Sequence, residues 1–168
     1  MKNFILVTAL LFAGFVGINA QETSVGLQYV RNNPTANLQY QPNTDSIGVV
    51  ASVTSYQTKT IGITGEASAN FGNRDGQFYT ALGGVTLKSR KYEAFQPFVK
   101  GLTGVGILRV RKNGVFPSRA DANVAFKLAA GADTGKGKYK WRNEVAYLQS
   151  DLFSNSAHFV TVSTGIVF

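Results

Sequence analysis

Five charged side chains stand in the middle of segments that alternate apolar and polar residues. Each lies among Gly, Ser and Thr residues on the polar face of its segment: Glu66, Lys100, Lys127, Arg142 and Glu144. A buried charge is costly unless it is paired and hydrogen-bonded, so we expect these side chains to form an ion-pair network. Such a network can be a polar plug that fixes the strand register, which we favour, or a gate that opens a narrow pathway.

His158 is the only histidine, and Asp151, Ser154 and Ser156 lie close to it in the sequence. A nucleophilic triad needs a hydrogen bond between His and Ser, and a third group that orients the imidazole. The alternative is a histidine in a surface loop with solvated serines around it. We favour the surface-loop interpretation.

A third group of side chains is cationic and lies in the segment RVRKNGVFPSRADA, residues 109–122. Its cations are Arg109, Arg111, Lys112 and Arg119. Such cations can clamp lipopolysaccharide phosphates or bind sulfated or acidic glycans. The alternative is a solvated loop whose charges have no specific partner.

Metal and cofactor chemistry has little support in the sequence. One histidine and no cysteine cannot supply the common transition-metal ligand sets, and the carboxylates are scattered. The segment TGKGK, residues 134–138, lacks the spacing of a phosphate-binding loop and is expected to form a tight turn. We therefore expect no metal and no cofactor.

The elements that must position these residues are strands. Apolar and polar residues alternate with period two in eight segments, which predicts eight strands and no helix. The segments are 24–30, 46–53, 60–71, 79–87, 95–107, 124–133, 139–147 and 160–168.

The polar face of these strands is thin, because many of its positions are glycine. A soluble barrel would carry long charged side chains on that face, whereas a narrow eight-stranded lumen is crowded and needs small residues. In an outer-membrane barrel the apolar face meets lipid and the polar face fills the lumen. The sequence therefore predicts an all-β fold, an eight-stranded antiparallel up-and-down transmembrane barrel over residues 21–168.

The connections predict the orientation of this barrel. With the N-terminus in the periplasm, three of the four outer connections are expected to be long, and the inner ones short. The long ones are 31–45, 109–122 and 148–158, and the short outer one is 72–77.

Residues 1–20 have the layout of a secretory signal peptide: Lys2, an apolar stretch, and Ala20 before the polar QETS. The apolar stretch is shorter than the roughly 20 residues of a spanning helix, so an N-terminal anchor is the weaker alternative. Cleavage after Ala20 predicts export to the bacterial outer membrane. The net charge of +8, which falls to +7 when Lys2 is removed with the signal peptide, favours anionic lipid head groups or surface polysaccharides as partners, and no nucleic-acid recognition motif is present.

The chain resembles the small outer-membrane β-barrel family of OmpA-like and opacity-type proteins. The resemblance is carried by the signal peptide, QPFVKGLTGVG at 96–106, FKLAAGAD at 126–133, WRNEVAY at 141–147 and the terminal VSTGIVF. It implies insertion by the outer-membrane assembly machinery, which recognises a final aromatic residue, here Phe168. We expect the barrel to be a monomer. The C-terminal peptidoglycan-binding domain of the larger relatives has no counterpart in this sequence.

The resemblance is specific for architecture and leaves three hypotheses for function. We expect a non-enzymatic barrel with a structural and surface-interaction role, comparable to an adhesin, exerted through its outer loops. The alternatives are a small channel for ions or solutes and an envelope lipid-modifying enzyme. Lipid A deacylases use a His with a nearby Ser and a carboxylate, but residues 150–161 do not match their motif.

Overall fold

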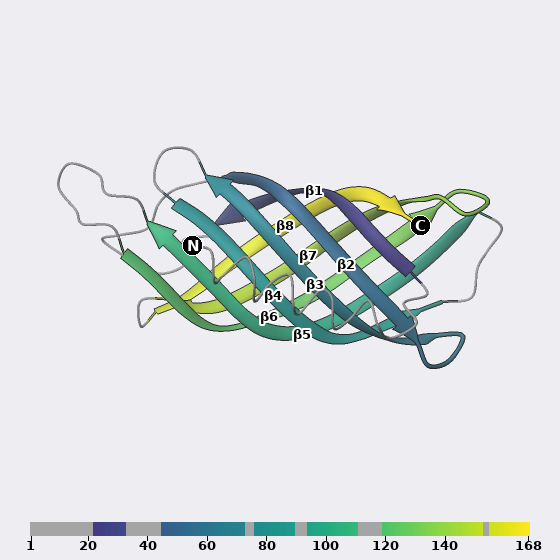
Figure 1. Cartoon of the computed structure of the whole chain (residues 1–168), viewed down its shortest axis with the longest axis horizontal. Helices are drawn as coiled ribbons and strands as arrows, with labels where there is room; N and C mark the ends of the chain where they lie inside the picture. Colours follow the sequence, from purple (N-terminus) through teal and green to yellow (C-terminus); the bar gives the residue numbers. More distant parts are fainter. Residues whose placement is uncertain (1–21, 33–44, 73–75, 90–93, 111–118, 153–154) are drawn as a thin grey trace.

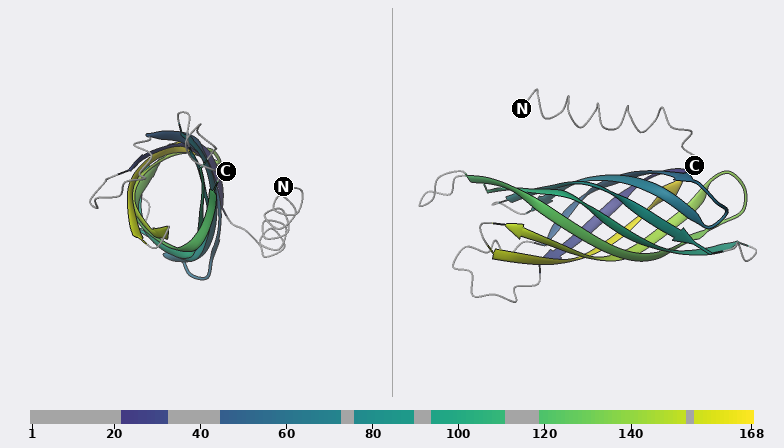
Figure 2. Two further views of the ribbon diagram at one scale, coloured as in Figure 1. Left: turned by 90° about the vertical axis from the view of Figure 1, so that its left-hand side faces the viewer. Right: turned by 90° about the horizontal axis from the view of Figure 1, so that it is seen from below.

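A computed structural model describes residues 22–32, 45–72, 76–89, 94–110, 119–152 and 155–168 of the chain. They form one closed antiparallel barrel in which every strand pairs with its neighbours in the sequence and β1 pairs with β8 (Figures 1 and 2). The strands are β1 (Glu22–Asn32), β2 (Ser46–Tyr56), β3 (Ile61–Gly72), β4 (Gly76–Lys88), β5 (Phe95–Val110), β6 (Arg119–Thr134), β7 (Lys140–Leu152) and β8 (Asn155–Val167). The predicted fold class is confirmed. The predicted signal peptide lies outside the described residues.

The pairing of β1 with β8 closes the barrel, and at one end of the barrel the start of β1 lies beside Phe168. The backbone N–H of Thr23 donates to the carbonyl of Phe168 at 3.0 Å, and the N–H of Phe168 donates back to Thr23 at 2.9 Å. We call this the terminal end; it also carries the connections 57–60, 89–94 and 135–139. The opposite end, which we call the loop end, carries the connections 33–45, 73–75, 111–118 and 153–154.

The expectation of three long connections at the loop end was wrong. Strand β7 continues to Leu152 and β8 begins at Asn155, so only residues 153–154 join them. The cross-strand ladder reaches Leu152 and Asn155 and absorbs the polar segment that the sequence suggested as a loop. Strands β5 and β6 are also longer than expected, at 16 residues each. A tilted strand needs about 9–11 residues to cross a membrane, so this pair extends beyond the hydrocarbon layer.

The outer wall of the barrel is apolar. Large side chains that point outward are about half exposed on every strand, including Leu27, Ile47, Leu128, Trp141 and Ile166. A surface of this extent is far larger than the apolar patches that soluble monomers expose, and lipid is the environment that covers it. The prediction that the apolar face of each strand points outward to lipid is therefore confirmed. Within the described residues, no helix is long and apolar enough to cross a membrane.

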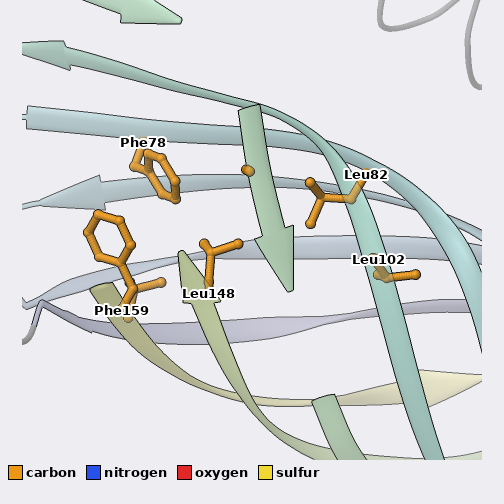
Figure 3. Packing of buried hydrophobic residues seen from close by; sticks show 7 residues of the cluster. Phe78, Leu82, Leu102, Leu148 and Phe159 are labelled. Atoms are coloured by element: carbon orange, nitrogen blue, oxygen red, sulfur yellow. The ribbon is translucent and has the colours of Figure 1, made fainter. Parts of the chain in front are cut away.

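The interior at the loop end is apolar as well, which the sequence did not predict. Figure 3 shows the side chains that fill it, with Phe78, Leu82, Leu102, Leu148 and Phe159 labelled. The rings of Phe78 and Phe159 stack with centroids 4.9 Å apart. The apolar plug, as we name this cluster, consists of Val30, Phe78, Leu82, Leu102, Ala125, Leu148 and Phe159. The expected small and polar inner face is thus correct only for the remainder of the lumen.

The inward glycines allow neighbouring backbones to approach closely, as the sequence suggested. At the seam of β1 and β8, a methyl group on Gly165 would lie 2.5 Å from the Cα of Gly26. No side chain fits at such a distance, so the closure of the barrel depends on glycine at this seam.

Candidate functional site: the charged lumen and the loop-end rim

Four of the five charged residues meet at the centre of the lumen. Glu66 on β3, Lys100 on β5, Lys127 on β6 and Glu144 on β7 all lie at inward positions of their strands. Lys127 Nζ lies 2.5 Å from Glu66 Oε1 and 2.6 Å from Glu144 Oε1. Lys100 Nζ lies 3.3 Å from Glu66 Oε2 and 2.7 Å from Glu144 Oε2. We call this group the ion quartet.

The ion quartet is a closed ring in which carboxylates and ammonium groups alternate. Each lysine contacts both glutamates, and each glutamate contacts both lysines, so the two positive and two negative charges cancel. All four side chains are at most 3% exposed. Charges buried to this degree are tolerated only when partners replace the water they have lost, and here every charge has two partners.

Arg142 lies apart from the ion quartet, and the prediction that grouped it there needs correction. On β7 it stands directly opposite Asp133 of β6, whereas Glu144, two residues further on, stands opposite Gly131. Its Nε donates to Asp133 Oδ1 at 2.7 Å and its Nη2 to Asp133 Oδ2 at 2.9 Å. This two-pronged contact with a carboxylate is the geometry for which the guanidinium group is best suited.

A second charged cluster forms around this pair at the terminal end of the lumen. Lys88 of β4 bridges Asp133, at 2.6 Å, and Glu22 of β1. Arg142 Nη2 reaches Glu22 Oε2 at 3.3 Å, and the Tyr56 hydroxyl donates to the same oxygen at 3.0 Å. We call Glu22, Lys88, Asp133 and Arg142 the terminal cluster. The sequence interpretation missed Glu22, Lys88 and Asp133, although Asp133 stands on the polar face of its strand and Lys88 continues the inward phase of Thr86.

Phe98 connects the two groups of charges. Its ring lies 5.2 Å from Lys100 Nζ of the ion quartet and 4.7 Å from Arg142 Cζ of the terminal cluster. Both cations are therefore within the range at which the face of an aromatic ring attracts them. Gly131 makes room for this ring, because a methyl group there would lie 2.6 Å from Phe98 Cζ.

From the loop end to the terminal end, the lumen thus holds the apolar plug, the ion quartet, Phe98 and the terminal cluster. The carboxylates of both charged groups are engaged by ammonium or guanidinium groups. Among the described residues, no group of His, Cys, Asp and Glu side chains is arranged to hold a metal ion. The chemistry that this arrangement supports is mutual charge compensation, which ties β1, β3, β4, β5, β6 and β7 together across the lumen.

His158 lies in β8 rather than in a surface loop, so that interpretation was wrong. Its Nδ1 lies 2.5 Å from the Tyr147 hydroxyl of β7, and the two rings stack with centroids 5.8 Å apart. Asp151 is exposed and stands opposite Ser156 in the β7–β8 ladder. Ser154 lies outside the described residues, and so does the side chain of Ser156. The partner of the imidazole is therefore a phenol on the outer wall of the barrel.

The four cations predicted to bind anions are placed only in part. Arg109 is exposed on β5, and Arg119 begins β6 opposite Val110, so both are strand residues at the loop end rather than loop residues. Arg111 and Lys112 lie outside the described residues. Phe168, the proposed assembly signal, lies at the terminal end with 48% of its surface exposed on the outer wall.

No protein-family model matches the chain, and no curated protein matches it in sequence. The barrel is similar to Neisserial surface protein A, with a TM-score of 0.71 at 6% identity over 87% of this chain and 94% of that one. The chain has the small outer-membrane β-barrel fold. This fold supports the predicted outer-membrane location.

Two other structures with this fold differ from each other in function. The attachment invasion locus protein Ail of Yersinia pestis, in complex with the heparin analogue sucrose octasulfate, gives a TM-score of 0.58 at 14% identity, over 88% of this chain and 97% of that one. The outer membrane enzyme PagL gives 0.51 at 13% identity, over 88% and 98% of the two chains. The small outer-membrane barrel fold therefore accommodates both binding proteins and enzymes.

Proposed function

We propose that the protein is a monomeric, non-enzymatic outer-membrane barrel that stabilises the envelope and interacts with anionic glycans at its loop end. Its terminal end faces the periplasm, where Phe168 serves the assembly machinery. The observation that carries the proposal is the packed lumen, in which the apolar plug and two charged groups follow one another. A lumen filled in this way leaves the rim at the loop end as the part available for partners.

The cations at this rim suit sulfated or acidic glycans. Arg109 and Arg119 lie near the ends of β5 and β6, the two longest strands, which carry them beyond the lipid-covered wall. A guanidinium group binds sulfate and carboxylate oxygens through paired N–H donors, which is the chemistry a sulfated glycan needs. The complex of Ail with sucrose octasulfate is an example of a similar barrel that binds a heparin analogue.

The alternatives have less support. A channel would require the apolar plug, the ion quartet and the Arg142–Asp133 pair all to move aside. An envelope enzyme would require a nucleophile next to His158, whose Nδ1 contacts Tyr147 instead. Hydrolysis of lipid A or phospholipid by the purified protein, lost in His158→Ala, would establish the enzyme and overturn this part of the proposal.

Heparin affinity tests the glycan interaction. The full chain in maltoside micelles is applied to immobilised heparin and eluted with salt, and free sucrose octasulfate serves as competitor. We expect Arg109→Gln/Arg119→Gln to weaken binding about three- to tenfold, the effect of losing two ion pairs between the protein and the glycan. The control is Lys136→Gln/Lys138→Gln in the exposed turn at the terminal end, which removes the same charge. Equal weakening in both variants would show non-specific attraction and overturn the proposal.

A further inference from the structure

A polar group interrupts the apolar outer wall near the loop end of β7, β8 and β1. Tyr147 and His158 face outward there, and the positions before and after them on the same strands, Ala146, Leu148 and Phe159, face the lumen. The lumen chemistry described above does not involve this pair, nor does the glycan rim on β5 and β6. An imidazole on a wall covered by lipid needs partners of its own, because an unsatisfied polar group is costly in such surroundings.

Within the described residues, the hydrogen bond to Tyr147 engages one of the two imidazole nitrogens, Nδ1. The Tyr147 oxygen lies 2.5 Å from Nδ1, and a phenol hydroxyl donates well to a neutral imidazole, so we assign Nδ1 as the acceptor of this bond. With Nδ1 as the acceptor, the ring proton resides on Nε2. Nε2 is then a hydrogen-bond donor at the other edge of the ring, held in orientation by the stacking with Tyr147.

Arg31 of β1 supplies a positive charge beside this donor. It is exposed, it faces outward because Val30 before it is buried in the lumen, and it stands opposite Val160 of β8. His158 is two residues from Val160 on the same face, so Arg31 and His158 are diagonal neighbours, a spacing of about 7–8 Å between backbones. Long side chains reach each other, or a common ligand, across that spacing. Within the described part of the chain, Arg31 makes no salt bridge.

Acidic groups limit where an anion can bind. Asp151 lies on the outer face of β7, two residues beyond Gln149, the cross-strand partner of His158. Asp45, before β2, hydrogen-bonds Tyr29 of β1. The β1–β2 register pairs Val30 with Ser46, so Asp45 lies on the β2 side of Arg31, while Asp151 lies on the β7 side of His158. The position left for an anion is therefore between Arg31 and His158, across β1 and β8.

We propose that Arg31 and the Nε2–H group of His158, held by Tyr147, bind the phosphate of a membrane lipid head group. The chemistry is that of a guanidinium and a neutral N–H donor converging on phosphate oxygens. The location selects a lipid, because the residues lie on the lipid-facing wall close to the strand ends, at the height of the aromatic girdle where head groups reside. Both lipid A phosphates and phospholipid phosphates offer this chemistry.

The single histidine makes the test direct, because one imidazole accounts for all histidine signals. The full chain, purified without a histidine tag and labelled with ¹⁵N-histidine, is placed in maltoside micelles that contain no phosphate. Its imidazole spectrum is recorded at one fixed, mildly alkaline pH while lipid A, phosphatidylglycerol or an uncharged galactolipid is added. We expect a proton on Nε2 before any addition, and a saturable shift of the Nε2 signal with phosphate-bearing lipid.

The three added lipids distinguish which lipid supplies the phosphate and which results would contradict the proposal. A shift with lipid A alone assigns the site to its phosphates, and a shift with both phosphate lipids assigns it to lipid phosphate in general. An equal shift with the galactolipid, no shift at all, or a proton on Nδ1 would each overturn the proposal.

Removing a positive charge at Arg31 and a negative charge at Asp151 should have opposite effects on lipid binding, and this tests where the anion lies. Arg31→Gln should raise the lipid concentration for half saturation about tenfold, as expected for the loss of one charge-assisted hydrogen bond. Asp151→Asn should lower it, because the repulsion from the β7 side is removed. Tyr147→Phe keeps the ring but removes the hydroxyl, and should redistribute the ring proton between the two nitrogens. Lys138→Gln at the terminal end is the control and should change nothing; a similar effect of Lys138→Gln and Arg31→Gln would overturn the assignment.

Discussion

Replacing Lys127 with Met removes one corner of the ion quartet while keeping much of the side-chain volume. In the intact protein Lys127 Nζ contacts Glu66 at 2.5 Å and Glu144 at 2.6 Å, with 3% of the side chain exposed. After the change, two buried carboxylates share Lys100 as their remaining quartet lysine, and one negative charge is uncompensated. Breaking a buried ion pair in this way costs about 3–5 kcal/mol, so we expect the free energy of unfolding to fall by that amount.

The only tryptophan provides the measurement. Trp141 is about half exposed on the outer wall, so its emission reports the transfer of β7 from lipid to water. The protein is reconstituted in phospholipid vesicles and unfolded with guanidinium chloride. Lys136→Met, in an exposed turn at the terminal end, is the matched control and should change stability by no more than about 0.5 kcal/mol.

A double-mutant cycle distinguishes charge compensation from simple packing. In Lys127→Met/Glu66→Gln, one ammonium group and one carboxylate remain, Lys100 and Glu144, which lie 2.7 Å apart. The quartet is neutral again, so the double variant should be more stable than the sum of the single losses predicts, by about 0.5–3 kcal/mol. Additive losses, or a Lys127→Met variant as stable as the Lys136→Met control, would refute the idea that the quartet acts as one electrostatic unit.

Three further predictions concern the lumen and the last residue. Gly131→Ala should destabilise the barrel by about 1–3 kcal/mol because its methyl group collides with the Asn143 carbonyl oxygen and with Phe98 Cζ, the latter at 2.6 Å. Gly101→Ala, with no atom within 4 Å of the new methyl group, should be close to neutral in the same unfolding assay. Glu66→Ala should be as silent as the wild type in planar bilayer recordings, since the apolar plug still closes the lumen; discrete openings in this variant would favour a gate. Phe168→Ser keeps the backbone bonds to Thr23, so it should refold normally in micelles but yield less heat-modifiable folded protein in cells, and normal yields would remove the assembly role.

The strands and their faces follow from the sequence because the physics that sets them is local. In an alternating segment every second side chain points the same way, so the placement of Lys100 and Lys127 in the lumen needs no knowledge of other strands. The same holds for the outward positions of Leu128 and Trp141, which are half exposed as expected. Composition then decides which face meets lipid.

The partners of the charges depend on pairing between strands, which periodicity does not contain. The register of β6 and β7 is fixed by the turn between them, where Gly135 and Gly137 have positive φ angles of 128° and 96°. This turn sets Arg142 opposite Asp133 and leaves Glu144 for the ion quartet. Shifting the pairing by two residues would change these partners and still match the inward face of one strand with the inward face of the other.

The apolar plug was missed for a related reason. Phe78, Leu148 and Phe159 occupy inward positions, but each has an apolar or aromatic outward residue on one side, namely Tyr79, Tyr147 and Val160, so the local contrast between the faces is weak. The inner position of these rings is evident only once β1, β4, β5, β6, β7 and β8 are brought together around one axis (Figure 3). Likewise, Asp151, Asn155 and Ser156 made 148–158 look like a loop, whereas the ladder of β7 and β8 extends almost to the turn.

The geometry of the charges also bears on the choice between plug and gate. Because every member of the ion quartet has two partners, moving any one side chain breaks two ion pairs at once and leaves its partners uncompensated in a dry interior. A gate works best when a single side chain can swing with little penalty, and this ring has no such member. Opening the centre would still leave the stacked rings of Phe78 and Phe159 above it and the Arg142–Asp133 pair below it. A conducting pathway therefore requires three separate rearrangements in series, and this favours a structural role for the charged lumen.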